Sequence, residues 1–224
     1  MAVDNQQILS GLDSEQLAVV TAIRGPVCVI AGAGTGKTRV ITNRIAYAIN
    51  SSVTDPTKVL ALTFTARAAG EMRARLRVLG VANVAARTFH SAALKQLLYF
   101  WPYAFGGQFP SLLTTKSGFI SQAIERSEVA IPAQANSLRE IASEIEWAKV
   151  LEISPDEYCQ KAIDNQRSVR LPNSKSDNEN LSMISQVYEA YETLKRQERT
   201  LDFEDVLLLT VGMLEEDRGV RERV

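Results

Sequence analysis

The chain has 224 residues, of which 46% are apolar, enough for a sizeable hydrophobic core in one large domain or two small ones. Its 25 basic and 26 acidic residues give a formal net charge of −1, so overall charge does not indicate a nucleic-acid partner. Apolar runs fall short of the roughly 18 residues of a membrane span, and no basic flank precedes an apolar stretch near the N-terminus, which argues against membrane insertion and export.

The two cysteines, Cys28 and Cys159, lie far apart in the sequence and match no metal-ligand spacing. Free thiols are typical of a reducing compartment, so the predicted location is the cytoplasm. Cys28 lies within an apolar run, and we expect it to be a small core residue.

Three short apolar runs in the first hundred residues predict β-strands, at residues 27–30, 59–62 and 84–86. Their nearly uniform apolar composition is typical of parallel strands that are covered on both faces. Between the second and third strands, apolar residues recur at spacings of four and three, which predicts a helix over residues 66–79 with one buried face. This alternation favours an α/β fold.

Positive charge is concentrated in residues 66–100, where Glu71 is the only acid. Most of the arginines alternate with the apolar positions of the predicted helix, so they must face outward. Charge alone leaves open whether they form a solvated face or a binding surface. The basic side chains are Arg67, Arg73, Arg75, Arg77, Arg87 and Lys95.

After Trp101, prolines and glycines interrupt the pattern, and the stretches that follow are helical. Residues 173–180 are almost purely polar, which predicts a loop. Apolar residues at helical spacing form two stripes. The first comprises Leu138, Ile141, Ile145 and Ala148, and the second comprises Leu181, Ile184, Val187, Tyr191 and Leu194.

A glycine-rich turn stands between the first predicted strand and a helix that begins near Lys37. Small residues in such a turn let successive backbone N–H groups point at phosphate oxygens, and the helix N-terminus adds its positive dipole end. Lys37 would reach the β- and γ-phosphates of a nucleotide, and the Thr38 hydroxyl would ligate Mg²⁺. The turn consists of Ala31, Gly32, Ala33, Gly34, Thr35 and Gly36.

One residue departs from the usual pattern of this turn. Ala31 occupies the position of the first glycine in G-x-x-x-x-G-K-[ST], so the strict pattern is not met. Gly34 and Gly36 retain the small residues that the tight geometry requires. Because a strand is predicted before the turn and a helix after it, the predicted chemistry is nucleotide binding.

Four further segments discriminate among the many enzyme classes that use such a loop. They are residues 12–16 (LDSEQ), 61–69 (ALTFTARAA), 87–91 (RTFHS) and 201–208 (LDFEDVLL). Together with the loop AGAGTGKTR, they resemble the opening motifs of superfamily 1 DNA helicases of the UvrD, Rep and PcrA type. The resemblance extends from Leu12 to Leu214 and is specific at these five places.

The resemblance implies a P-loop NTPase (RecA-like) α/β fold, in which a parallel sheet with flanking helices is interrupted by an all-helical subdomain. Residues 1–109 would begin the ATP-binding domain, 110–197 would form a helical accessory insertion, and 198–224 would return to the ATP-binding domain. ATP and Mg²⁺ would be the cofactors. Gln16 would read the adenine edge, and Arg39 would lie beside the nucleotide. Without its neighbours, Gln16 would be interpreted as a solvated helix residue.

In this family, the residues at the end of the second predicted strand lie on the path of single-stranded DNA. Thr63, Phe64 and Thr65 occupy this position here. A threonine hydroxyl can bond a phosphate, and an aromatic ring can stack on any base. The family commonly has Asn-Lys where this chain has Ala66 and Arg67, so one polar contact is lost while Arg67 keeps the charge.

The end of the third predicted strand repeats this arrangement with Thr88, Phe89 and His90. His90 is the only histidine of the chain. A single histidine is more often a structural hydrogen-bonding group than a ligand or base, so DNA contact and core packing both remain open for it.

The Asp-Glu pair that the family uses to hold Mg²⁺ and to orient the attacking water is not found on an apolar strand of this sequence. We therefore expect the chain to end before that motif and to lack turnover by itself. Asp202, Glu204 and Asp205 are expected to form a water-facing helix surface, with metal binding as the alternative.

By the same resemblance, the parent protein would be an ATP-dependent 3′-to-5′ helicase or translocase that acts on single-stranded DNA and duplex junctions in DNA repair. Its partners would be C-terminal motor domains and repair proteins, and no membrane. Two other functions remain open: a small-molecule P-loop phosphotransferase, and a nucleotide-sensing module that binds nucleic acid. A phosphotransferase would need an acceptor pocket and would have no use for the two Thr-Phe segments.

Overall fold

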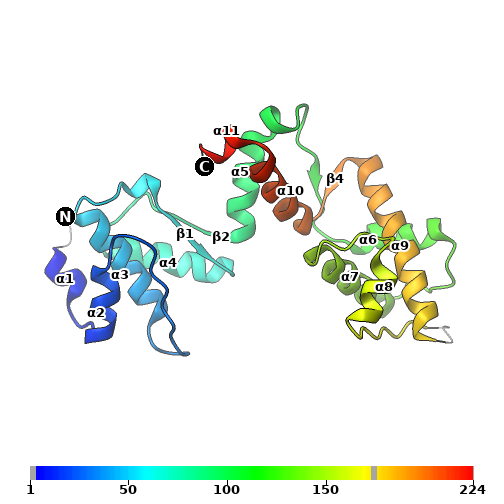
Figure 1. Cartoon of the computed structure of the whole chain (residues 1–224), viewed down its shortest axis with the longest axis horizontal. Helices are drawn as coiled ribbons and strands as arrows, with labels where there is room; N and C mark the ends of the chain where they lie inside the picture. The colour runs from blue at the N-terminus through cyan, green and yellow to red at the C-terminus, as the bar shows by residue number, and fades with distance from the viewer. Residues whose placement is uncertain (1–3, 173–175, 224) are drawn as a thin grey trace. The chain divides into compact units, whose positions relative to one another are not determined.

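The computed structural model describes residues 4–172 and 176–223 of the chain. The chain forms two compact units, Met1–Ala92 and Ala93–Val224 (Figure 1). Each unit combines helices with a parallel sheet of two strands, so the chain is mixed α/β and mostly helical. None of the described helices combines the length and the apolar character needed to cross a bilayer.

The first unit contains one parallel β-α-β crossover. Strand β1 (Leu60–Thr63) leads into helix α4 (Ala66–Val78), which leads to strand β2 (Ala85–Thr88) (Figure 1). These bounds confirm the second and third predicted strands and the helix between them. The remaining elements are α1 (Asn5–Leu9), α2 (Ser14–Thr21), α3 (Lys37–Asn50), η1 (Pro56–Lys58) and the beginning of α5 (Phe89–Ala104).

Helix α4 covers one face of the two-stranded sheet. Its Met72 and Leu76 are buried together with one alanine from each strand. Leu60 and Leu62 share the opposite face because side chains alternate along a strand, and they are 49% and 37% exposed. The expectation that both faces are covered is therefore wrong for β1 in the part of the chain that the structure describes.

Residues 27–30 form no strand, contrary to the prediction. Their side chains are exposed, including that of Cys28, which was expected in the core, and Ile30 is 99% exposed. A strand forms only where a neighbouring strand satisfies its backbone N–H and C=O groups, and in the described sheet β1 and β2 pair only with each other. An apolar run shows that a segment suits a sheet but does not supply its partner.

The second unit has two hydrophobic clusters. The larger one lies among α6 (Ser117–Ser127), α7 (Ala135–Val150), α8 (Tyr158–Asp164) and α9 (Asp177–Glu198). Both predicted apolar stripes face this core, with Leu138 half-buried and the others buried, so the helical prediction is confirmed. The smaller cluster joins α5 to α10 (Phe203–Glu216) and α11 (Arg218–Arg221).

A short parallel sheet joins the two ends of the larger bundle. Strand β3 (Ser111–Leu112) precedes α6, and strand β4 (Thr200–Leu201) follows α9. The N–H of Ser111 donates to the Arg199 carbonyl at 3.0 Å, and the N–H of Leu113 donates to the Leu201 carbonyl at 2.8 Å. The chain thus enters and leaves the bundle at one place.

The prediction of a loop over residues 173–180 is wrong for residues 177–180. Residues 173–175 lie outside the described residues. Helix α9 already begins at Asp177, because the Ser176 hydroxyl accepts the N–H of Glu179 as an N-cap and acids in the first turn suit the helix dipole. Asn180 is buried, and its Nδ2 donates to the Val169 carbonyl at 2.6 Å. Residues 177–180 are therefore a capped helix start rather than a loop.

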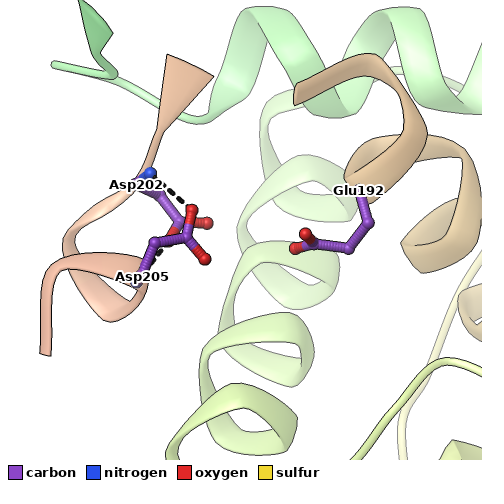
Figure 2. Close-up of side chains that lie close together, drawn as sticks. All are labelled: Glu192, Asp202 and Asp205. Atoms are coloured by element: carbon purple, nitrogen blue, oxygen red, sulfur yellow. Dashed lines mark hydrogen bonds between the residues drawn. The ribbon is translucent and has the colours of Figure 1, made fainter. Parts of the chain in front are cut away.

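A buried network of charges links α7, α9 and the start of α10. The Lys149 Nζ lies 2.8 Å from both carboxylate oxygens of Asp202, and the Lys195 Nζ lies 3.0 Å from Asp202 Oδ2. Both ammonium groups also pair with Asp205 and Glu192. Figure 2 shows the three carboxylates, with Asp202 and Asp205 at the start of α10 and Glu192 on α9. Asp202 is 1% exposed, so the expectation of a water-facing acidic surface is wrong for this residue.

The acids of this network also cap α10 and lie close enough together to be considered as metal ligands. The Asp202 and Asp205 carboxylates accept each other's backbone N–H at 3.0 Å, which forms a capping box at the start of α10. Carboxylate oxygens of Glu192, Asp202 and Asp205 lie within 4.8 Å of one another, a spacing that could hold a metal ion. However, the ammonium groups of Lys149 and Lys195 already pair with all three carboxylates, so the arrangement is an ion network and does not support the metal interpretation.

The charges in the network shift one another's pKa values. Burial alone would raise the pKa of Asp202, but Lys149 and Lys195 outweigh it and hold that pKa well below its usual 3.8. Burial alone would lower the pKa of Lys149, but Asp202, Glu192 and Asp205 outweigh it and hold that pKa above its usual 10.5. Both groups are therefore charged across the whole neutral range.

We predict that Asp202→Asn lowers the free energy of unfolding by about 3 kcal/mol at pH 7, because it leaves two buried ammonium groups short of a counter-charge. The folded-state pKa of Asp202 lies below 3.8, so this contribution is complete above that pH and is lost as pH falls through the folded-state pKa. Denaturant unfolding at pH 7 and at acid pH measures both effects.

Glu189→Gln is the matched control for this prediction. Glu189 pairs with Arg196 on the surface, with the two side chains 61% and 69% exposed, and such a pair contributes about 0–1 kcal/mol. Equal effects of the two variants at pH 7 would show that the buried network adds no stability.

Candidate functional site

The glycine-rich turn leads directly into α3, as predicted. Gly36 is the N-cap of this helix and Lys37 is its first residue. Gly34 and Gly36 have φ values of 80° and 81°, in the left-handed region that glycine adopts without strain. The turn therefore depends on glycine at these two positions, of which Gly36 is the second glycine of the usual pattern.

Lys37 is held at the centre of this turn by its own loop. Its Nζ donates to the carbonyl of Ala31 at 3.2 Å and to that of Gly32 at 2.5 Å. The ammonium group thus lies over the turn, where it can exchange these two carbonyl acceptors for phosphate oxygens. Thr38, the predicted Mg²⁺ ligand, is half-buried in the first turn of α3.

Gln16 contacts the same turn from α2. Its backbone N–H donates to Asp13 Oδ1 at 2.8 Å, and its Oε1 accepts the Asp13 N–H at 3.4 Å, which makes a capping box. The Gln16 Nε2 donates to the Thr35 carbonyl at 3.2 Å. Both ends of this amide are therefore engaged, and the side chain is oriented toward the phosphate loop.

A pocket of about 890 Å³ brings these groups together. It is lined by Gln16, Lys37 and Arg39, by most of the loop, and by apolar side chains such as Val19 and Val40. Ala33 and Thr38 are the predicted nucleotide residues that do not line it. A pocket of this size with a few convergent polar groups is typical of a small-molecule site.

Arg39 differs from its predicted placement in one respect. Its Nη2 donates to the carbonyls of Ser10 and Gly11, at 3.2 and 3.0 Å, while the residue also lines the pocket. In the described structure, this guanidinium group therefore binds the loop that precedes α2. Its contact with a nucleotide stays a prediction.

The two predicted aromatic residues lie side by side at neighbouring strand ends. Thr63 of β1 is opposite Thr88 of β2, so the next residues, Phe64 and Phe89, emerge together. Their ring centroids are 5.5 Å apart with an interplanar angle of 37°. The rings are 89% and 45% exposed, which leaves ring surface open for stacking.

Threonines begin the helices that follow both strands. The Thr65 hydroxyl accepts the N–H of Ala68 at 3.1 Å and caps α4, and the Thr88 hydroxyl accepts the N–H of Ser91 at 3.2 Å in α5. Capping uses only acceptor capacity, and a hydroxyl also has one O–H donor. The predicted phosphate contact needs this donor, so the two roles are compatible.

The predicted charged contacts lie on the surface. Arg67 is exposed and pairs with Glu71 one helical turn away, with the Nε and the carboxylate 3.3 Å apart. Such a pair contributes little and is readily exchanged for another anion. His90 is exposed in the first turn of α5, so the core-packing alternative for this histidine is wrong.

Sequence reasoning missed two arginines that organise the first unit. Arg44 of α3 donates from Nε and Nη2 to the Ala22 carbonyl, at 3.0 and 2.7 Å. Arg73 of α4 donates to the Ala86 carbonyl of β2 at 2.7 Å. The sequence around these arginines does not predict the hydrogen bonds, because the acceptor carbonyls are distant in sequence and come near only in the folded chain.

Comparison with known proteins agrees with these features. The UvrD/REP helicase N-terminal domain family matches residues 12–224. The ATP-dependent DNA helicase UvrD2 of Mycobacterium tuberculosis (strain ATCC 25618 / H37Rv) is 42% identical over 233 residues, which cover 99% of this chain and 32% of the relative. The ATP-dependent DNA helicase PcrA of Bacillus subtilis (strain 168) is 29% identical over 215 residues, covering 94% of this chain and 27% of PcrA.

The chain therefore spans about a third or less of the length of these curated relatives. The family match covers nearly all of the described chain, including the phosphate loop, both strand ends and the acidic segment at the start of α10. On this match, the chain belongs to the UvrD/REP helicase N-terminal domain family.

Proposed function

We propose that this chain is the ATP-binding part of an ATP-dependent DNA helicase, with a P-loop NTPase fold of the RecA-like type. One observation carries the proposal: Gln16 and Lys37 converge on one pocket at the glycine turn, while the same unit exposes the paired rings of Phe64 and Phe89. The names of the relatives, ATP-dependent DNA helicases, agree with both halves of this arrangement.

The pocket at the glycine turn fits a nucleoside triphosphate. Lys37 supplies a cation over the turn, Gly34 and Gly36 allow the backbone to approach closely, and α3 presents its N-terminus. Thr38 would hold Mg²⁺, which neutralises phosphate charge when bound. Gln16 would read the adenine edge, and the remaining loop residues would donate backbone N–H groups to phosphate.

Single-stranded DNA would run across the ends of β1 and β2. Phe64 and Phe89 would stack on bases without sequence preference, and the hydroxyls of Thr63, Thr65 and Thr88 would donate to phosphates. Arg67 and His90, both exposed, would add polar or charged contacts.

The finer assignments rest on the resemblance to UvrD, Rep and PcrA. These are 3′-to-5′ movement, action at duplex junctions, a role in DNA repair with repair proteins as partners, and a cytoplasmic location. The division of the chain into domains at residues 1–109, 110–197 and 198–224 is proposed on the same resemblance. The pairing of β3 with β4 supports it, because it brings residues 111–112 beside 200–201 at the ends of the proposed insertion.

We predict that Lys37→Ala in the full-length protein reduces DNA-stimulated ATP hydrolysis and unwinding by at least about a hundredfold, because the cation over the phosphates is lost. Single-stranded DNA binding should be largely spared, since the Phe64 and Phe89 rings are untouched. Lys58→Ala, an exposed lysine outside the pocket, is the control. Normal unwinding by Lys37→Ala would contradict the assigned role.

We predict that Phe64→Ala and Phe89→Ala each weaken single-stranded DNA binding about tenfold, the effect of removing one stacking ring. ATP affinity should not change. Val78→Ala removes an apolar side chain that is 81% exposed on α4 and serves as the control. Filter binding with labelled DNA and ATP measures both affinities, and ATP binding without any DNA binding would favour a small-molecule phosphotransferase instead.

We predict that the 224-residue chain by itself shows negligible DNA-stimulated ATP hydrolysis. It has the phosphate cradle but no Asp-Glu pair on an apolar strand to orient the attacking water. Phosphate release, compared with that of the full-length protein, measures this. A rate near that of the full-length protein would refute the prediction.

A further inference from the structure

Helix α2, which carries Gln16, has little apolar anchoring of its own. Among its eight residues only Val20 is fully buried, and Leu17 is 39% exposed. Hydrophobic burial of one valine side chain contributes about 1.5–3 kcal/mol and does not by itself fix the orientation of a helix. Other contacts must therefore hold α2 in place.

Two arginines of α3 bind the chain at the two ends of α2. Before α2, Arg39 Nη2 donates to the carbonyls of Ser10 and Gly11. At its other end, Arg44 donates from both Nε and Nη2 to the carbonyl of Ala22, the C-cap residue. Carbonyls at a helix C-terminus have no partner within the helix, and a cation there also complements the helix dipole.

The backbone is shaped for the first of these contacts. Gly11 has φ of 69°, and a Cβ added to it would lie 3.1 Å from Arg39 Nη2. A side chain at this position would therefore strain the backbone and crowd the guanidinium group.

These contacts couple Gln16 to Lys37. The helix that begins with Lys37 also carries both arginines, and Gln16 lies between the two ends that they hold. The Gln16 amide reaches the Thr35 carbonyl at 3.2 Å, so a small rotation of α2 would separate it from the loop. A shift of about 1 Å at such a site is enough to change recognition strongly.

We propose that Arg44, together with Arg39, is a positioning residue for nucleotide-base selection: it holds α2 on α3 and thereby keeps Gln16 at the adenine side of the phosphate loop. The proposal rests on the proposed function, in which Gln16 reads adenine. Arg44 also lines the pocket, but its Nε and Nη2 are engaged by the Ala22 carbonyl, and through this contact it acts on α2.

The test is the ratio of KM for GTP to KM for ATP in DNA-stimulated hydrolysis by the full-length protein. Arg44→Met removes both donors but keeps the apolar stem, and it is expected to lower this ratio about fivefold, the effect of losing one well-placed hydrogen bond. The kcat at saturating ATP should be nearly unchanged. Arg44→Lys, which keeps a single donor for the Ala22 carbonyl, should give an intermediate ratio and carries the test if Arg44→Met does not fold.

Two further variants test whether Arg44 acts through Gln16 and whether the effect is specific to Arg44. Gln16→Ala should lower the same ratio, and Arg44→Met added to Gln16→Ala should lower it no further, because both changes act on one contact. Arg24→Met, an exposed arginine outside the pocket, is the control and should leave the ratio as in the wild type.

The outcomes separate the two proposals. A lowered ratio in Gln16→Ala with wild-type ratios in both Arg44 variants would overturn the positioning role and leave the proposed function intact. A wild-type ratio in Gln16→Ala would overturn the assignment of Gln16 as the adenine reader, and the positioning role with it. An Arg44→Met variant that loses kcat and raises both KM values equally would show a structural role only.

Discussion

The first unit depends on side chains of α3 that satisfy backbone carbonyls of the N-terminal segment. Asn43 donates to the Ile8 carbonyl at 2.6 Å, Arg39 donates to those of Ser10 and Gly11, and Arg44 donates to that of Ala22. The buried bond to the Ile8 carbonyl satisfies a group that water cannot reach, whereas the bonds from Arg39 lie at the surface and orient the chain there. The helix that presents Lys37 to the phosphate loop is thus also the support for the segment that presents Gln16.

The second unit meets a similar requirement with charge. Asp202 is buried where the chain leaves the helical bundle, and it is stable there only because Lys149 and Lys195 surround it and its own capping contacts are made. In the first unit, polar side chains of α3 therefore hold the N-terminal segment. In the second unit, lysines of α7 and α9 hold the segment that contains Asp202. Apolar packing sets the cores, and these contacts set the orientation of what is attached to them.

Much of this was predictable from the sequence because the signals are local. Helical spacing gave both stripes of the bundle, and glycines before Lys37 gave the loop and the start of α3. The network had a signal that was available: Lys149 lies four residues after Ile145, and Lys195 lies four after Tyr191, so both lysines lie on apolar stripes and must be buried.

Other features were not predictable because they depend on distant partners. The apolar run at residues 27–30 has the composition of a strand, yet no described strand pairs with it. The acceptor of Arg44 lies 22 residues away, and nothing near either residue indicates the contact. The resemblance implied that Phe64 and Phe89 both lie along the path of DNA, but the pairing of their rings at 5.5 Å follows only from the register of β1 and β2.

The small β3–β4 sheet has a consequence for how this architecture can vary. Because Leu112 and Leu201 are paired neighbours, the segment of roughly ninety residues between them begins and ends at adjacent positions of one sheet. Evolution or a protein engineer could lengthen, shorten or exchange that segment without stretching the chain on either side, as long as the two-residue junction is kept. This two-residue junction therefore allows the helices between β3 and β4 to vary in sequence and length without changing the chain on either side.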